Sequence, residues 1–267
     1  MSQQIPNYIF QTWKTKTNVD SKRSKYINSI KIHNSNMEHF LYDDSDCDIF
    51  VRDKFPRYYK LYNELELPVQ KADLWRYLVI YYYGGYYLDI DCKSVKSFRN
   101  ISNSNKENLL IVEQENPCPF KPLNGFPRNP QYAQYWFGAT PRHPAIKNVI
   151  NRVIKNINNK IDNDKGDKNI NDKNINNKTL FLTGPGPWTD GIVDHIKQSG
   201  KKDVYIIKPN RFDILSIGID TDLIHKYKNT PVIHQAAGSW RVKDDNDDNY
   251  YYIIFIILVI IMLIILF

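Results

Sequence analysis

The feature that most constrains the fold is the stretch at residues 68–92, which reads PVQKADLWRYLVIYYYGGYYLDIDC. Its apolar residues up to position 82 recur with helical spacing, and proline suits the first turn of a helix. Gly84 and Gly85 end that helix, and residues 86–90 resume as an apolar strand. A helix that turns directly into a buried strand favours an α/β architecture.

Short apolar runs and helical patterns alternate along the rest of the chain, which supports the same fold class. We expect one helix over residues 21–32 and another that begins near Pro144. The expected strands are residues 5–10, 40–43, 109–113, 135–138, 204–207 and 232–234. Three widely spaced cysteines without a Cys-x-x-Cys pair argue against a disulfide scaffold and a zinc finger.

Two acidic residues close the strand that follows the glycine pair. Asp89 and Asp91 are separated by one residue, so in extended chain both carboxylates point to the same side. Burying both is costly unless a cation neutralises them, and a hard divalent ion is the natural partner. The alternative is a chance Asp-x-Asp pair exposed at a strand end. Glu113 and Glu115 form a second acid pair, for which solvation at a strand end is the simpler interpretation.

Asp73 and Arg76 lie three residues apart on the predicted helix and therefore share a face. The glycine turn brings this face back toward Asp89 and Asp91, so the four side chains can converge on one cleft. Arg76 is suited to phosphate oxygens in such a cleft. The alternative is an ion pair on the helix surface, which contributes little to stability.

This stretch resembles the central motif of glycosyltransferase family 32, a Lys-x-Asp-x-x-Arg-Tyr helix followed by Gly-Gly-x-Tyr-x-Asp-x-Asp. Further matches occur in the family's order, and they are IPNYIFQTWK at residues 5–14, FGATPRHP at 137–144, TGP at 183–185 and HQAAGSW at 234–240. Phe10 departs from the family, where His is common. The resemblance covers residues 4–241, and the composition resembles a version from a large DNA virus or a protist.

The resemblance implies a GT-A fold, in which an α/β sheet binds the nucleotide at the carboxyl ends of its strands. It implies a metal-dependent transferase that moves a hexose, with mannose favoured, from a nucleotide-diphosphate sugar to a glycan, lipid or protein acceptor. GDP-mannose is the favoured donor and a UDP-hexose the alternative. The resemblance also implies that the anomeric configuration is retained. No carboxylate in the sequence can be identified as a nucleophile, so we expect front-face attack by the acceptor hydroxyl.

The same resemblance implies individual roles for the motif residues. Asp91, Asp89 and His234 would bind Mn²⁺ or Mg²⁺, and Arg76 would act with the two aspartates in catalysis. The residues implied to bind the donor are Gln11, Thr12, Trp13, Asp73, Arg76, Gly85, Asp89, Ser239 and Trp240. For His234 and Trp240, ordinary packing in the core is the alternative.

The net charge of +7 raises the question of a nucleic-acid ligand, but the basic residues are spread along the chain. The over-used residue types (Phe, Ile, Lys, Asn and Tyr) have A/T-rich codons, so genome bias explains the charge more simply than a selected polyanion surface. We therefore expect no nucleic-acid partner. A nucleoside diphosphate or an anionic membrane would benefit from the same charge.

One segment interrupts the expected catalytic domain, and two more follow it. Residues 158–177, within the domain at residues 1–243, are rich in Asn, Lys and Asp and predict an expanded surface loop. Residues 244–249 read as a linker. Residues 250–267 carry no charge, Pro or Gly, and as a helix they would span roughly 27 Å, near the thickness of a thin bilayer core. A buried core helix is the alternative, although such a helix normally carries a polar face.

We therefore expect a single-pass protein with a C-terminal anchor in a host or virion membrane and its catalytic domain on the cytosolic side. Arg241 and Lys243 precede the apolar run, in agreement with a positive-inside orientation. The odd cysteine count and the lack of a signal peptide in the sequence favour a reducing compartment. Two rival functions are a nucleotide-sugar hydrolase, in which water replaces the acceptor, and a non-catalytic carbohydrate-binding module tethered to a membrane.

Overall fold

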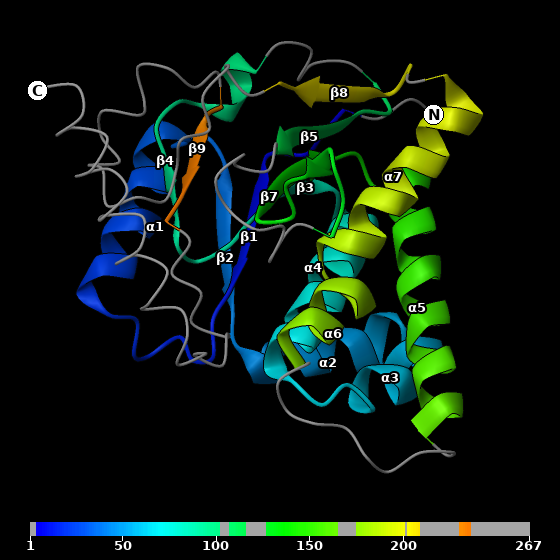
Figure 1. The fold of residues 1–267 in the computed structure, drawn as a ribbon. Helices are drawn as coiled ribbons and strands as arrows, with labels where there is room; N and C mark the ends of the chain where they lie inside the picture. The colour runs from blue at the N-terminus through cyan, green and yellow to red at the C-terminus, as the bar shows by residue number, and fades with distance from the viewer. Residues whose placement is uncertain are drawn as a thin grey trace, which may run out of the picture.

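The computed structural model describes residues 4–101, 107–115, 127–164, 175–200, 202–208 and 230–235 (Figure 1). The described helices are α1 (Ser21–His33), α2 (Asp44–Lys54), α3 (Pro56–Asn63), α4 (Pro68–Tyr83), α5 (Pro144–Asp164), α6 (Ile175–Leu182), α7 (Pro185–Ser199) and the short 3₁₀ turn η1 (Phe98–Asn100). The described strands are β1 (Tyr8–Thr12), β2 (Glu38–Tyr42), β3 (Gly85–Leu88), β4 (Cys92–Ser94), β5 (Leu110–Glu115), β6 (Gln131–Tyr132), β7 (Trp136–Ala139), β8 (Val204–Ile207) and β9 (Val232–His234). The α/β class expected from the sequence is confirmed.

Most of the strands form one mixed sheet in the order β2-β1-β3-β7-β5-β6, and β8 also pairs with β5. Strand β1 runs parallel to β2 and β3, whereas β7 runs antiparallel to both β3 and β5. Strands β1, β3 and β5 therefore point the same way, and their carboxyl ends meet at one edge of the sheet. That edge carries the residues discussed below.

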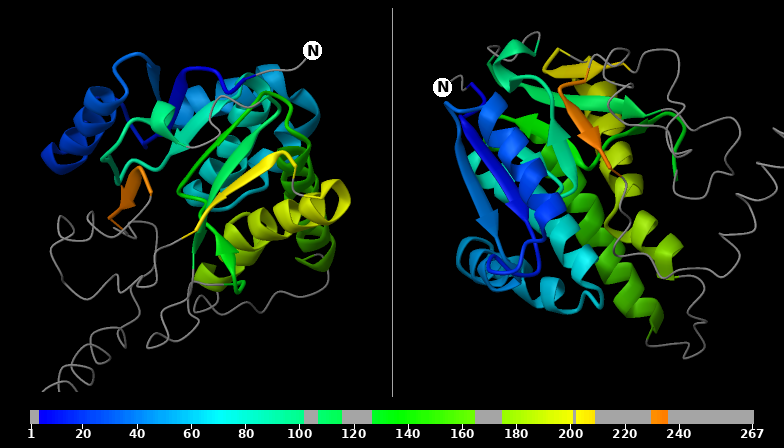
Figure 2. Two further views of the ribbon diagram at one scale, coloured as in Figure 1. Left: turned by 90° about the horizontal axis from the view of Figure 1, so that it is seen from above. Right: turned by 90° about the vertical axis from the view of Figure 1, so that its left-hand side faces the viewer.

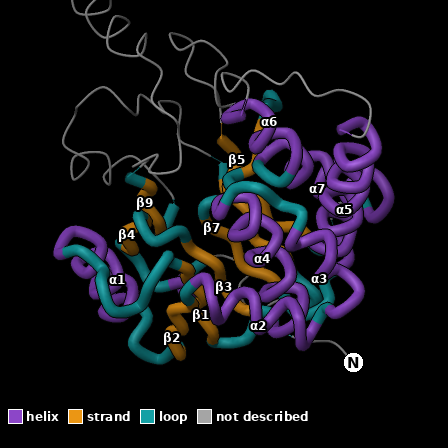
Figure 3. Tube along the Cα trace, turned by 90° about the horizontal axis from the view of Figure 1, so that it is seen from below, coloured by secondary structure: helices purple, strands orange, loops and turns teal. Residues whose placement is uncertain are grey.

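The two faces of the sheet are covered by different layers, because successive side chains of a strand point in opposite directions. Tyr87 and Phe137 belong to the core that α4, α5 and α7 close. Their strand neighbours Tyr86 and Trp136 belong to a second core, which contains Ile30 of α1. Helix α1 and the β4–β9 ribbon lie at one end of the molecule, and α5 and α7 lie at the other (Figure 2; Figure 3).

The glycine pair performs the turn expected of it. Gly84 and Gly85 both have positive φ, at +67° and +98°, a conformation that side-chain-bearing residues rarely adopt. A Cβ on Gly85 would also lie 2.7 Å from the carbonyl oxygen of Tyr8. The missing side chain thus lets β3 begin directly against β1.

Helix α5 is longer than the sequence analysis expected. It continues to Asp164, so residues 158–164 are helical rather than part of an expanded loop. Ile157 is buried and Ile161 packs against the core, and both continue the spacing of Val153. This periodic apolar stripe outweighs the polar composition of the segment. The sequence patterns did not predict helices α2, α3, α6 and α7, and α6 begins at Ile175, within the segment expected to be a loop.

None of the helices in the described ranges combines the length and apolarity needed to cross a membrane. The expected linker and membrane span, residues 244–249 and 250–267, lie outside those ranges. Cys47 and Cys92 are buried free thiols, and the third cysteine, Cys118, lies outside the described ranges.

Candidate active site

Helix α4 carries two charged residues into the interior of the protein. The helix starts at Pro68, and the Gln70 side chain accepts a hydrogen bond from the backbone nitrogen of Leu67 at 3.4 Å. One turn later, the side chains of Asp73 and Arg76 are only 4% and 6% exposed. The alternative of a surface ion pair is therefore wrong, and burial at this level requires that both charges be neutralised nearby.

Arg76 connects the helix to the end of β3. Its Nη2 lies 3.1 Å from Oδ1 of Asp73, and its Nη1 lies 3.1 Å from Oδ1 of Asp89. Nη1 also donates to the carbonyl oxygen of Gln134 at 3.2 Å, and the guanidinium stacks over the ring of Tyr87 at 4.6 Å. Burial opposes the charge of Arg76, but the two carboxylates outweigh it and raise the pKa of the guanidinium. The side chain therefore remains a cation.

Asp73 is fully engaged by its neighbours. Thr183 Oγ1 donates to Oδ2 at 2.8 Å, and Gln134 Nε2 donates to Oδ1 at 3.1 Å. Burial raises the pKa of Asp73 to about 6, while Arg76 opposes that shift. These contacts make Asp73 the residue that fixes Arg76 and Gln134 in place.

Asp89 follows β3 directly and is held through both its backbone and its side chain. Its backbone nitrogen donates to the carbonyl of Tyr135 at 2.8 Å, and the Tyr87 hydroxyl donates to Oδ1 at 2.6 Å. Burial raises the pKa of Asp89, Arg76 opposes the shift, and nearby Asp91 adds to it. The carboxylate is nevertheless 26% exposed, so a ligand can reach it.

His234 reaches the acidic pair through the small β4–β9 ribbon, in which Cys92 is paired with His234. Its Nε2 lies 3.3 Å from Oδ1 of Asp91, and its ring stacks on Tyr135 with centroids 4.3 Å apart. Burial lowers the pKa of His234, but the neighbouring carboxylates, Asp91 above all, outweigh burial and raise it. The structure thus brings His234, a residue of the last sequence motif, next to Asp91.

Asp89, Asp91 and His234 together form a ligand set suited to a divalent metal. One ligand atom from each residue lies within 4.8 Å of the other two. Two carboxylate oxygens and one imidazole nitrogen suit Mn²⁺ and also accommodate Mg²⁺. The chemistry of these donors therefore fits the ion that the sequence resemblance implied.

Gln11 supports the same edge from β1. It is completely buried, donates from Nε2 to the carbonyl oxygen of Asp89 at 3.1 Å, and bonds through Oε1 with Nε2 of His39 at 2.7 Å. Because Gln11 Oε1 is an acceptor, His39 Nε2 carries the proton in this contact. Burial lowers the pKa of His39 to about 4, with Lys31 adding to the shift, so the ring is neutral at pH 7. Gln11 therefore positions Asp89 from inside the sheet.

Of the two residues after Gln11, Thr12 borders a cavity and Trp13 packs against Arg23. Thr12 Oγ1 donates to the carbonyl of Tyr42 at 3.1 Å and borders a cavity. Trp13 lies beneath the Arg23 guanidinium, 4.2 Å from the ring centroid, and its Nε1 is buried without a hydrogen-bond partner in the described part of the chain.

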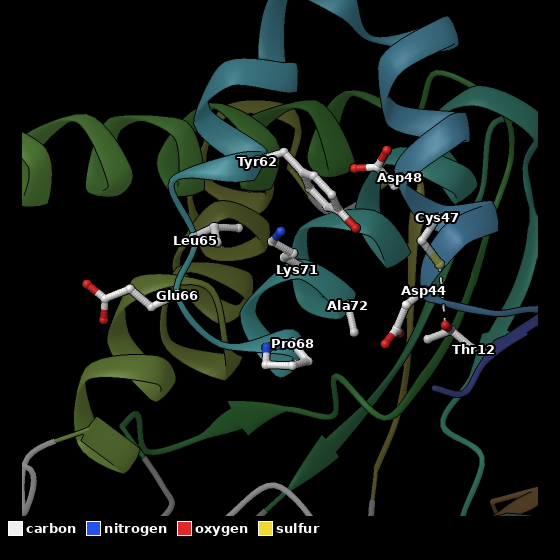
Figure 4. Close-up of a pocket in the computed structure, with 10 residues that line it drawn as sticks. All are labelled: Thr12, Asp44, Cys47, Asp48, Tyr62, Leu65, Glu66, Pro68, Lys71 and Ala72. Atoms are coloured by element: carbon white, nitrogen blue, oxygen red, sulfur yellow. Dashed lines mark hydrogen bonds between the residues drawn. The ribbon is translucent and has the colours of Figure 1, made fainter. Parts of the chain in front are cut away.

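The cavity beside Thr12 has a volume of about 280 Å³ and opens between α2, α3 and α4 (Figure 4). Ala72, the neighbour of Asp73, borders it from α4. Two of its lining residues, Thr12 and Ala72, are the sequence neighbours of Gln11 and Asp73. The complete lining is Thr12, Asp44, Cys47, Asp48, Tyr62, Leu65, Glu66, Pro68, Lys71 and Ala72.

Three residues expected to bind the donor are not brought into this cluster by the described structure. Gly85 lies at the opposite end of β3 from Asp89, where it is explained by its close approach to Tyr8. Ser239 and Trp240 lie outside the described residues. The structure thus gives Gly85 a packing role, and we do not keep it among the proposed substrate contacts.

The second acid pair was also interpreted incorrectly. Glu113 is buried, and it accepts a hydrogen bond from Nε1 of Trp136 at 2.7 Å. Glu115 accepts one from Nε2 of Gln131 at 3.0 Å. Solvation at a strand end therefore does not describe Glu113, because tertiary packing supplies its partner.

A second group of metal-ligand residue types lies at the opposite edge of the sheet. His143, His195 and Asp203 meet there, with His195 Nε2 at 2.8 Å from Oδ2 of Asp203. His143 Nδ1 accepts a hydrogen bond from the backbone of Ala145 at 3.2 Å, so its Nε2 carries the proton and faces the Asp203 carbonyl at 3.3 Å. The imidazoles of His143 and His195 thus both form hydrogen bonds within the protein, in a network at the start of α5.

Comparison with known proteins finds similarity to glycosyltransferases, in agreement with the sequence resemblance. A family profile described as "Glycosyltransferase sugar-binding region containing DXD motif" matches residues 20–108, which include Asp73, Arg76, Asp89 and Asp91. The solved structure of the PaToxG glycosyltransferase aligns with a TM-score of 0.50 at 19% identity, over 75% of this chain and 73% of that one. At this identity the structural likeness concerns the fold alone.

Similar sequences include two fungal enzymes and a viral protein. The initiation-specific alpha-1,6-mannosyltransferase of Schizosaccharomyces pombe is 29% identical over 201 residues, which cover 72% of this chain and 49% of the relative. Its Candida albicans counterpart is 26% identical over 211 residues, with coverages of 73% and 54%. An uncharacterized glycosyltransferase of Acanthamoeba polyphaga mimivirus is 36% identical over 90 residues, with coverages of 33% and 36%. The chain thus spans about half the length of the fungal relatives.

Proposed function

We propose that this chain is one of the glycosyltransferases whose sugar-binding region contains a DXD motif, and that it transfers a hexose from a nucleotide-diphosphate sugar to an acceptor hydroxyl. The proposal includes a GT-A type of donor site at the carboxyl ends of β1 and β3. The names of the fungal relatives favour mannose as the sugar. A glycan, lipid or protein is the acceptor in this proposal.

The observation that carries the proposal is the buried, hydrogen-bonded cluster around Arg76, placed directly beside a cluster of metal-ligand residues. Arg76 contacts Asp73 and Asp89, and Asp89 is itself grouped with Asp91 and His234. A fixed cation next to convergent ligand atoms suits a leaving group that carries two phosphates.

In this proposal Asp89, Asp91 and His234 hold Mn²⁺ or Mg²⁺, and the bound ion supplies positive charge that stabilises the departing diphosphate. Arg76 supplies further positive charge from the protein. Gln11 and the hydroxyl of Tyr87 hold Asp89 in position, so the site needs little reorganisation when charge develops.

We propose retention of configuration with front-face attack by the acceptor. Both carboxylate oxygens of Asp73 accept hydrogen bonds from the protein, and Oδ1 of Asp89 contacts both Arg76 and Tyr87. Carboxylates engaged in this way are poorly placed to act as free nucleophiles, which favours direct attack by the acceptor.

The test is turnover of a panel of GDP- and UDP-hexoses with Mn²⁺, with and without glycan, lipid and protein acceptors. Acceptor-dependent release of nucleoside diphosphate, with a glycosylated product, would support a transferase. Equal release without an acceptor would identify a hydrolase instead. Binding of sugars without turnover of any donor would identify a carbohydrate-binding module and overturn the proposal.

We also propose that residues 250–267 insert into a membrane and leave the catalytic domain on the cytosolic side. The uninterrupted apolar composition of this segment supports the proposal, as do Arg241 and Lys243 just before it. Protease added to intact microsomes should digest the catalytic domain. Protection of that domain would contradict the orientation.

A further inference from the structure

Three polar side chains that form no side-chain hydrogen bond or ion pair with another described residue line the cavity between α2, α3 and α4. The first is Tyr62, which is 2% exposed and extends its hydroxyl into the cavity (Figure 4). No hydrogen bond engages that hydroxyl in the part of the chain that the structure describes. The hydroxyl is accessible from the cavity, where a ligand or solvent can form a hydrogen bond with it. Burial raises the pKa of Tyr62, and the group therefore stays neutral.

Asp44 and Lys71 are the other two. The Asp44 carboxylate lies toward Ala72 across the cavity (Figure 4), and no hydrogen bond or ion pair joins it to another described residue. The Lys71 ammonium lies 5.4 Å from the ring centroid of Tyr62, again without an ion pair among the described side chains. The cavity is thus lined by a carboxylate that can accept hydrogen bonds, a hydroxyl, and an ammonium group that can donate them.

The remaining acids of the lining are already engaged. Asp48 accepts a hydrogen bond from the Tyr59 hydroxyl at 3.0 Å. Glu66 is paired with Lys160 at 2.7 Å and extends away from the cavity (Figure 4). Asp44 is therefore the acid that a ligand would meet.

The charge and size of the cavity limit what it can bind. Asp44 and Asp48 outnumber Lys71 among the charged side chains that face the cavity, so the cavity disfavours phosphate. Its volume of about 280 Å³ is just below the range of roughly 300–1,000 Å³ typical of sites for a whole drug-sized ligand. A neutral part of a larger ligand fits these conditions, and in a nucleotide sugar that part is the base with its adjoining ribose.

The donor and acceptor groups favour one base over another. Guanine presents the adjacent N1–H and N2–H donors beside its O6 acceptor, whereas uracil places a single N–H between two carbonyl oxygens. A carboxylate can accept both guanine donors at once, but next to uracil it meets at least one repelling oxygen. An ammonium or hydroxyl group would complete the pattern by donating to O6.

We propose that Asp44, assisted by Tyr62 and Lys71, is the residue set by which this protein selects a guanine nucleotide over a uracil nucleotide. The inference rests on the proposed function and adds to it the identity of the base and the residues that recognise it. A base in this cavity adjoins Thr12 and Ala72, the chain neighbours of Gln11 and Asp73. The diphosphate would then extend toward Asp89 and Asp91.

The experiment measures binding of GDP and UDP to the full chain by titration calorimetry in the presence of Mn²⁺. The wild-type protein should bind GDP at least about 10-fold more tightly than UDP. Asp44→Asn should weaken GDP binding by about 10-fold or more, because the amide replaces one acceptor with a donor, and it should change UDP binding less than about 2-fold. Tyr62→Phe should also weaken GDP binding selectively, which provides a second test if the Asp44 variant folds poorly.

Asp53→Asn is the matched control. Asp53 lies on the same helix, loses the same charge on substitution, and pairs with Arg52 at the surface. It should leave the affinities for both nucleotides unchanged. Preference for UDP, or equal effects of Asp44→Asn and Asp53→Asn, would overturn the base assignment while leaving the proposed transferase intact. Failure of the wild-type protein to bind either nucleotide would overturn both proposals.

Discussion

Arg76 of α4 and Asp89 at the end of β3 form a buried contact, with 3.1 Å between Nη1 and Oδ1. The contact joins the helix to the strand that follows it. It also places a permanent cation beside Asp91 and His234, the other two residues of the candidate metal site. One guanidinium therefore stabilises the fold and prepares the site for negative charge.

Arg76→Lys should lower kcat/KM by about 10- to 100-fold even though the positive charge is kept. Lysine has one compact ammonium group and cannot engage Asp73, Asp89 and the Gln134 carbonyl in the fork geometry of arginine. Steady-state kinetics with the preferred donor would measure the loss, and circular dichroism would confirm that the variant is folded.

Arg152→Lys is the control for Arg76→Lys, because Arg152 pairs with Asp194 in a much more exposed position. It should have little effect on activity. Wild-type kinetics for Arg76→Lys would show that the guanidinium is not needed at the site.

His39 should make the stability of the protein depend on pH. Its pKa is about 4 in the folded protein and about 6.5 when unfolded, so between these values the unfolded chain binds the proton more strongly. The free energy of unfolding should therefore fall as the pH drops from 6.5 to 4, with His39 contributing on the order of 2–3 kcal/mol.

His39→Gln isolates this contribution, because glutamine can still donate to Gln11 but does not titrate. Urea unfolding of both proteins across this pH range would give the difference. The raised pKa of Asp73 has the opposite effect on the pH dependence of stability. Because Asp73 is present in both proteins, its contribution cancels in the difference. A difference between wild type and variant that does not change with pH would contradict the assignment.

Ile157→Ala should lower the free energy of unfolding by about 2–4 kcal/mol, because it leaves a cavity where α5 meets the core. Lys155→Ala, at an exposed position on the same helix, should change it by less than about 0.5 kcal/mol. Chemical denaturation measures both values. Equal, small effects would mean that this part of α5 is not packed.

The convergence of Asp73, Arg76 and Asp89 could be predicted because it depends on short-range geometry. The i,i+3 spacing places two of these residues on one helix face, and the glycine turn returns the chain within a few residues. The length of α5 was also readable from Val153, Ile157 and Ile161. The polar composition around them was weighted too heavily.

The supporting residues could not be predicted in the same way. Gln134 and Thr183 bond Asp73 across 61 and 110 residues of sequence, so their contacts depend on strand order and on the packing of α4 against the segment between α6 and α7. The cavity has the same origin, since Asp44, Tyr62 and Lys71 come from three different helices. No local pattern in a single sequence specifies such tertiary neighbours.

The most direct test of the account is turnover of the preferred nucleotide sugar by wild type and by Asp91→Asn, each with Mn²⁺ and with EDTA. Asp91 should contribute both to holding the metal and to stabilising the departing diphosphate. The account predicts a loss of at least about 100-fold in the variant and loss of wild-type activity in EDTA. Undiminished turnover by Asp91→Asn, or full wild-type activity in EDTA, would contradict it.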